Sequence, residues 1–140
     1  MSCNFSPDNT YLAVGHAVTP YITIYKRSGD TFTKLANPVT LPALTGNGCS
    51  WSSNGTYLAV GHNNSPYITI YKRSGDTFTK LANPVTLPTG PINGCSFSLD
   101  DAYLVMTQTG TPFINIYKRA GDVFTKLANP ATLPAGTGYG

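Results

Sequence analysis

Thiol and imidazole groups are the side chains of this sequence best suited to bind a metal ion, and both recur at a fixed spacing. The cysteines stand 46 residues apart, at Cys3, Cys49 and Cys95, so a ring of repeats would carry a ring of thiols. There is no C-x-x-C motif and no cluster of histidines near a cysteine, which zinc sites typically show. We therefore expect no metal, and we assign the cysteines to packing positions, where cysteine acts as a small hydrophobic residue.

A second set of candidate residues combines histidine with aromatic rings. Histidine occupies one repeat position twice and glutamine replaces it in the third copy, and five residues later each copy has an aromatic residue. Exposed rings beside Asn, Ser and Thr can stack on sugars; buried rings would instead be core, with the imidazoles bonded to loop backbone. The candidate ligand-facing loop comprises His16, His62, Gln108, Tyr21, Tyr67 and Phe113.

A Lys-Arg pair precedes a Gly-Asp turn in each repeat. In a ring these pairs would form a basic crown able to hold an anionic glycan or a nucleic-acid backbone. The net charge is only +3, however, and charges beside outer strands also discourage edge-to-edge pairing. We favour this second role and expect no nucleic-acid partner. The candidate basic crown comprises Lys26, Arg27, Lys72, Arg73, Lys118 and Arg119.

Groups for catalysis are scarce. Glutamate is absent, and the aspartates lie in predicted turns, where Asp bonds its own backbone. The chain has no G-x-S-x-G, P-loop or H-E-x-x-H motif. We predict that it is not an enzyme and uses no cofactor.

Each repeat divides into four β-prone segments separated by turn residues. In the first repeat they are residues 2–6, 11–16, 21–27 and 31–35. A 46-residue period fits β-propeller blades or helical HEAT repeats, and a chain with 14 Gly, 11 Pro and nine Tyr excludes the helical option. We predict an all-β fold of three blades of four antiparallel strands, over residues 3–48, 49–94 and 95–140.

The repeat resembles the blades of WD-repeat-like β-propellers. The run CNFSPDNTYLAVG (residues 3–15) is similar to the innermost and second strands of such a blade, and ITIYKRSGD (22–30) to its third strand and turn. Tyr25-Lys26 replaces the Trp-Asp of many members, and the Gly-His before the first strand is missing. The resemblance therefore implies the fold, not a specific partner.

The first two units agree at 32 of 40 positions (3–42 against 49–88), which indicates recent amplification or deliberate construction. Such agreement fits a fragment or an engineered form of a highly repetitive bacterial or phage propeller.

Three blades are fewer than the roughly four that a closed propeller needs. Two apolar sheet faces would stay open, and neither end carries a polar capping unit. We expect a homo-oligomer in which the third blade of one chain docks on the first blade of the next, head to tail, until a symmetric ring closes. The expected inter-blade core includes Cys3, Cys49, Cys95, Phe5, Trp51 and Phe97.

Bulky aromatic residues on the innermost strands favour a wide ring, so we favour a homotrimer of nine blades over a homodimer of six. The predicted function is a non-catalytic, self-assembling scaffold or interaction module. The alternative is a multivalent carbohydrate-binding lectin, with a glycan as partner.

No segment approaches the ~20 apolar residues of a membrane helix. The N-terminal residues lack the basic start and apolar core of a signal peptide. We expect no membrane partner; free cysteines are compatible with the cytoplasm, but the sequence does not determine the location.

Overall fold

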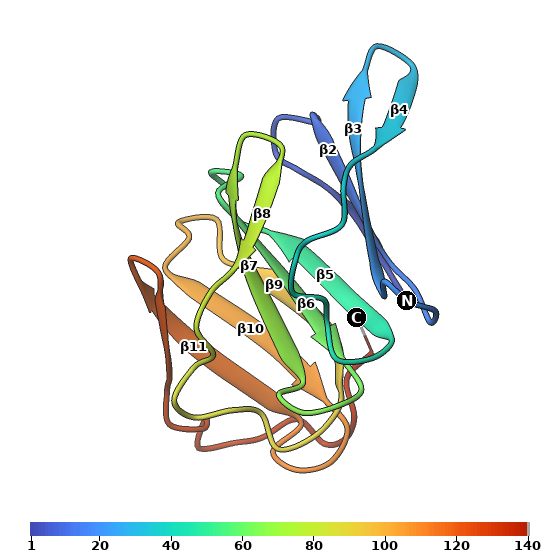
Figure 1. The fold of residues 1–140 in the computed structure, drawn as a ribbon. Helices are drawn as coiled ribbons and strands as arrows, with labels where there is room; N and C mark the ends of the chain where they lie inside the picture. Colours follow the sequence, from blue (N-terminus) through green and yellow to red (C-terminus); the bar gives the residue numbers. More distant parts are fainter. Residues whose placement is uncertain (140) are drawn as a thin grey trace.

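The computed structural model describes residues 1–139, and each repeat forms one four-stranded antiparallel sheet. Within each sheet the strands pair in chain order, and the three sheets lie side by side like the blades of a fan (Figure 1). This confirms the all-β prediction with four antiparallel strands per repeat. The strands are β1 (Cys3–Phe5), β2 (Tyr11–Gly15), β3 (Ile22–Ser28), β4 (Thr31–Lys34), β5 (Gly46–Trp51), β6 (Tyr57–His62), β7 (Ile68–Ser74), β8 (Thr77–Lys80), β9 (Ile92–Phe97), β10 (Tyr103–Gln108), β11 (Ile114–Ala120) and β12 (Val123–Lys126).

Hairpin turns follow the turn chemistry of the sequence. In the β1–β2 turn the Ser6 hydroxyl donates to Asp8 (2.5 Å) and accepts from the Tyr11 amide (2.8 Å). Asn9 takes the left-handed backbone conformation there (φ 57°), which Asn tolerates. Gly29 has φ 58° in the β3–β4 turn, a conformation that favours glycine. These turns fix the register of each sheet.

The first strands of the sheets, β1, β5 and β9, lie next to one another on the inner side of the fan, and β4, β8 and β12 form its outer edge. The backbones of the inner strands come close: a Cβ atom on Gly48 would lie 2.7 Å from the Gly94 Cα. Cys3, Cys49 and Cys95 lie on β1, β5 and β9, so the cysteines are on innermost strands. Strands β5 and β9 begin three residues before Cys49 and Cys95.

The hydrophobic core consists of two layers, one on each side of the middle sheet. Successive strand residues point to opposite faces, so Leu58 and Val60 pack toward the first sheet while Tyr57 and Ala59 pack toward the third. All four are buried. The residues 1–139 contain no helix long and apolar enough to cross a membrane.

Candidate functional site

The outer face of the first sheet carries residues whose equivalents in the second repeat are buried between two blades. We call the contact between two neighbouring blades of this chain an inner junction. Phe5 is 44% exposed, whereas Trp51, 46 residues later, is 5% exposed and packs between the first two sheets. We call this surface the head face; it comprises Cys3, Phe5, Leu12, Val14, Tyr25 and Phe32, all exposed or half-buried. Their equivalents Cys49, Trp51, Leu58, Val60, Tyr71 and Phe78 all belong to the first core layer.

The outer face of the third sheet has the complementary set. Tyr103 is 37% exposed, whereas its equivalents Tyr11 and Tyr57 are 4% and 5% exposed. We call this surface the tail face; it comprises Tyr103, Val105, Ile114 and Ile116, all exposed or half-buried. The middle sheet buries the same four positions, Tyr57, Ala59, Ile68 and Ile70, against the third sheet. The two ends of the chain thus present the two halves of one blade–blade junction.

A polar clamp completes each inner junction at its outer rim. Between the second and third sheets, the Tyr57 hydroxyl donates to an Asp122 carboxylate oxygen (2.6 Å) and Lys72 Nζ donates to the other oxygen (2.8 Å). The Arg119 guanidinium lies over the Tyr57 ring, 5.0 Å from its centre. Tyrosine and lysine come from one blade, while aspartate and arginine come from the next.

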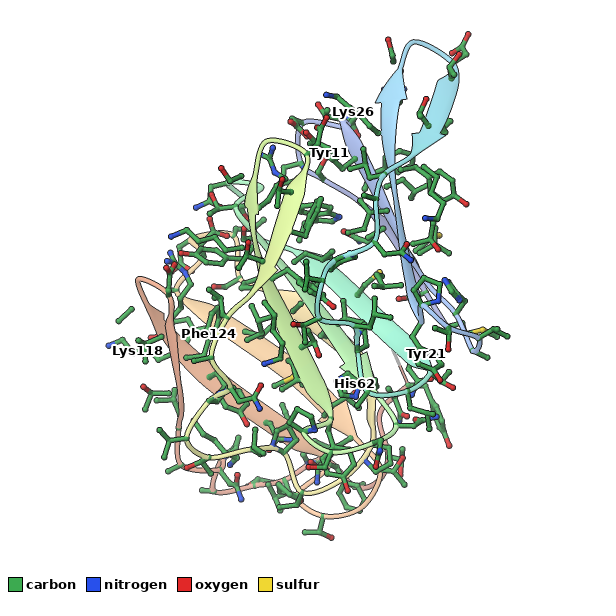
Figure 2. The ribbon with its side chains drawn as sticks, in the orientation of Figure 1. Tyr11, Tyr21, Lys26, His62, Lys118 and Phe124 are labelled. Carbon is green, nitrogen blue, oxygen red and sulfur yellow. The ribbon has the colours of Figure 1, made fainter. Side chains whose placement is uncertain are left out.

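The first junction repeats this geometry. Tyr11 donates to Asp76 (2.6 Å), Lys26 donates to its second oxygen (2.9 Å), and Arg73 lies 4.9 Å from the centre of the Tyr11 ring. Figure 2 shows Tyr11 and Lys26 together beside the β7–β8 hairpin. The hydrogen bond from Tyr11, followed by that from Lys26, lowers the pKa of Asp76. Burial and the Asp76 hydrogen bond raise the pKa of Tyr11.

The six residues of the candidate basic crown are thus largely engaged in these clamps. Lys26 and Lys72 pair with aspartates, and Arg73 and Arg119 cover tyrosine rings. Arg27 Nε donates to its own hairpin at Gly29 O (2.8 Å). Lys118 is exposed, and within residues 1–139 its side chain has neither a hydrogen-bond partner nor an ion-pair partner. Most of the crown is therefore part of the blade junctions.

The histidine positions of the candidate ligand-facing loop hold the loop after the second strand of each blade. His62 is fully buried and its Nε2 lies 3.1 Å from Thr69 Oγ1. Gln108 is also fully buried and accepts a hydrogen bond from Asn115 Nδ2 (2.7 Å). His16, half-buried, pairs with Thr23 (2.9 Å). The third repeat thus replaces a His–Thr pair by a Gln–Asn pair, which maintains the contact.

The aromatic members of this loop are half-buried. Tyr21, Tyr67 and Phe113 have backbone φ values of 67°, 67° and 66°, and Tyr67 packs on the second core layer. The structure therefore places the six residues in three equivalent loops, with His62 and Gln108 closed to solvent. Figure 2 shows Tyr21 and His62 at the same end of the sheets.

Burial of His62 predicts a loss of stability in mild acid. Loss of hydration lowers the pKa of His62 below its usual 6.5. Below about pH 6.5 the unfolded chain therefore binds a proton at His62 that the folded chain does not bind. As the pH falls, the free energy of unfolding decreases by at most about 1.4 kcal/mol per pH unit. Urea unfolding between pH 7.5 and 5 measures this slope.

The matched variant for this test copies the third repeat. His62→Gln with Thr69→Asn keeps a side-chain pair in the same loop but removes the titrating group. We expect this double variant to have a flatter stability profile over the same pH range. A slope equal to that of the unmodified chain would assign the acid sensitivity to other groups.

The thiols lie between innermost strands and the preceding blade. Cys49 Sγ is 3.7 Å from Ala13 O, and Cys95 Sγ is 3.6 Å from Ala59 O. Burial raises the pKa of both thiols, and Cys3 is exposed on the head face. Within residues 1–139 no group of three His, Cys or Asp side chains is arranged to hold a metal ion.

The clamp is the feature that the sequence interpretation missed. The sequence predicts that its aspartates serve in turns and that its lysines discourage edge-to-edge pairing of outer strands. The available signal was the fixed YKR and GD segments of all three repeats, since a turn or a solvated surface alone tolerates variation at such positions. Each aspartate does lie in a turn, but its carboxylate bonds to the neighbouring blade.

Three four-stranded sheets packed around adjoining inner strands are the arrangement of a β-propeller. The structure is similar to a protein of Bacteroides fragilis described as a candidate 6-phosphogluconolactonase (TM-score 0.76, 16% identity over 90% of this chain) and to a protein of Lactobacillus plantarum (TM-score 0.74, 18% identity over 97%). It is also similar to the Cps50 (Swd1) β-propeller domain of Myceliophteria thermophila (TM-score 0.67, 12% identity over 94%). The sequence matches no protein-family model and no curated protein.

These similarities show a propeller-like fold and nothing finer, because all three identities are below a fifth. The chain spans 37%, 42% and 39% of the length of the three proteins. It therefore spans less than half of each of these three proteins.

Proposed function

We propose that this chain is a non-catalytic β-propeller module that assembles with copies of itself, head to tail, into a closed ring serving as a scaffold or interaction platform. The observation that carries this proposal is the match between the open faces and the inner junctions. The head face and the tail face have the residue types that the middle sheet buries on its two sides. Docking one on the other removes both apolar faces from water.

Ring size follows from the number of blades in each copy. Three copies would give nine blades and two would give six, and both satisfy the same head-to-tail contact. We favour three copies, because Trp51 and Phe97 are bulky side chains on innermost strands, beyond the point where Gly48 and Gly94 let two of these strands approach. Large side chains on the inner side of a junction suit a ring of more blades.

The engagement of the carboxylates supports a non-catalytic role. Asp76 and Asp122 belong to clamps, Asp8 and Asp100 bond the serine and backbone of their own turns, and Asp101 accepts from the backbone of the second blade. Of the six aspartates, all within residues 1–139, only Asp30 has a side chain without a hydrogen-bond partner. These six residues therefore include no pair of carboxylates that is free for acid–base catalysis.

Solution mass tests the proposal directly. The purified chain should give one species at three times 14.9 kDa in size-exclusion light scattering, or at two times that mass for six blades. Because the contact is intermolecular, dilution should convert this species to the 14.9 kDa monomer. A folded monomer at all concentrations, or an open series of masses, would overturn the closed ring.

Reactivity of Cys3 gives a second measure of the same contact. This thiol lies on the head face and is exposed in the single chain, so assembly should protect it from a thiol reagent. The Cys3→Ser variant supplies the background from Cys49 and Cys95. Equal Cys3 labelling at low and high protein concentration would show that assembly, if present, leaves the head face open.

A further inference from the structure

The chain contains the two halves of a third polar clamp, separated on its first and third blades. Asp30 is the equivalent of Asp76 and Asp122, at the tip of the β3–β4 hairpin. Tyr103 and Lys118 are the equivalents of Tyr57 and Lys72, on β10 and β11. Figure 2 shows Lys118 on the opposite side of the molecule from the β3–β4 hairpin, so these groups do not meet within one chain.

Each half of this clamp is in the state expected when its partner is absent. Asp30 and Lys118 are exposed, whereas the equivalent Lys72–Asp122 pair is 2.8 Å apart. Arg73 and Arg119 both cover a tyrosine ring, with Nε donating to the first turn of their own blade at Gly55 O and Asp101 O. Arg27 has no ring to cover, and its Nε bonds to Gly29 O instead.

We propose that the contact between copies is closed by this clamp: Asp30 of one copy accepts hydrogen bonds from Tyr103 and Lys118 of the next, and Arg27 moves over the Tyr103 ring. The inference rests on the proposed head-to-tail assembly and names the groups that select its partner. A tail face meets an aspartate and an arginine at the rim only when it docks on a head face. The clamp therefore favours head-to-tail docking over the head-to-head or tail-to-tail contact of two apolar faces.

The partner that fits is a second copy of this chain, because its two open faces carry opposite charges and complementary apolar surfaces. The head side offers Asp30 beside an apolar surface, and the tail side offers Lys118 beside the complementary apolar surface. Two inner junctions show that the same side chains, 46 residues apart, form the full set of contacts. Tail-to-tail docking would place two Lys118 ammonium groups together, and like charges at an interface weaken association.

Charge reversal tests the clamp. Asp30→Lys places two ammonium groups at the junction, and Lys118→Asp places two carboxylates there. We expect either single variant to need at least about tenfold more protein for half-assembly than the unmodified chain, as followed by light scattering on dilution. The monomer should stay folded, because both side chains are exposed and neither forms a hydrogen bond or an ion pair within residues 1–139. Circular dichroism checks this.

Recombining the two changes gives the decisive result. The chain with both Asp30→Lys and Lys118→Asp has restored, reversed clamps at every junction, so its half-assembly concentration should return to within about threefold of the unmodified chain. The two positions cannot meet in one monomer, so this rescue reports an intermolecular pair. An equal mixture of the two single variants can alternate only in rings with an even number of copies; it should restore a ring of two copies, but not a ring of three.

The outcomes separate this inference from the proposed assembly. If the unmodified chain is monomeric, the proposed function fails and the clamp fails with it. If the unmodified chain assembles and the single reversals assemble equally well, the assembly stands and the clamp is overturned. If the single reversals weaken assembly and the double reversal does not restore it, the two residues do not form the proposed pair. The reversal Lys26→Asp, within the first inner clamp, is the control for altering a clamp without changing the closing contact.

Discussion

Replacement of Trp51 by alanine should lower the free energy of unfolding by about 3–5 kcal/mol, as is typical for truncating a buried aromatic residue. Trp51 is 5% exposed, stacks on Tyr11 (ring centres 6.1 Å apart) and meets Phe78 edge-to-face (5.7 Å). Its indole Nε1 also donates to Asn4 O on the first blade (3.1 Å). The variant therefore loses packing on both blades and leaves a cavity between them.

The loss is large beside the roughly 5–15 kcal/mol by which domains are usually stable. Urea unfolding followed by circular dichroism is the measurement, because the chain has only one tryptophan and the variant lacks its fluorescence. A change below about 1 kcal/mol would mean that the two blades are not packed on Trp51 as the structure describes.

The equivalent change on the head face is the matched control. Phe5 occupies the same strand position as Trp51 but is 44% exposed in the single chain. Phe5→Ala should cost the monomer less than about 1 kcal/mol, because little packing is removed. In the proposed ring the same residue fills the closing junction, so Phe5→Ala should weaken assembly strongly. Equal effects of Phe5→Ala and Trp51→Ala on the diluted monomer would contradict an open head face.

Substitution of Gly61 by threonine should destabilise the chain by about 1–3 kcal/mol or more, through overpacking at the second junction. A Cβ atom on Gly61 would lie 2.8 Å from the Cβ of Ile92, which is buried on β9. Neither residue can move without shifting a strand. Threonine is the informative replacement because the third repeat carries it at the same place, as Thr107. Thermal unfolding and urea unfolding followed by Trp51 fluorescence measure the loss.

The structure shows why threonine is accepted in the third repeat. Thr107 faces Gly138, where an added Cβ would lie 2.7 Å from Thr107 Cγ2. Gly61→Thr combined with Ile92→Gly copies this arrangement at the second junction. We expect the double variant to lose less free energy of unfolding than the two single variants lose together, by about 0.5–3 kcal/mol. Additive effects would show that the two positions do not compete for the same space.

The strands and turns could be predicted from the sequence because their causes are local. The segment predicted at residues 31–35 is β4 (Thr31–Lys34), and the segment predicted at 11–16 is β2 (Tyr11–Gly15). Turn residues mark these boundaries: Asn9 and Gly29 adopt left-handed conformations that few other residues tolerate.

The junction contacts could not be predicted in the same way, because they join residues about 50 to 65 positions apart. The spacing from Lys26 to Asp76 is one period plus four residues, and that from Tyr11 to Asp76 is one period plus nineteen. Both offsets depend on how one blade is turned against the next. Similarly, the sequence alone does not place Asn115 beside Gln108, the residue that replaces histidine in the third repeat.

The sequence by itself determined the repeat and the four strands of each blade, since periodicity and turn residues act over a few neighbouring positions. Only the tertiary structure decided which charged residues belong to a junction, because electrostatic and hydrogen-bond contacts require the distance between side chains on different sheets. A carboxylate such as Asp76 has the same local sequence whether it faces water or Lys26. The packing of adjacent blades makes that choice.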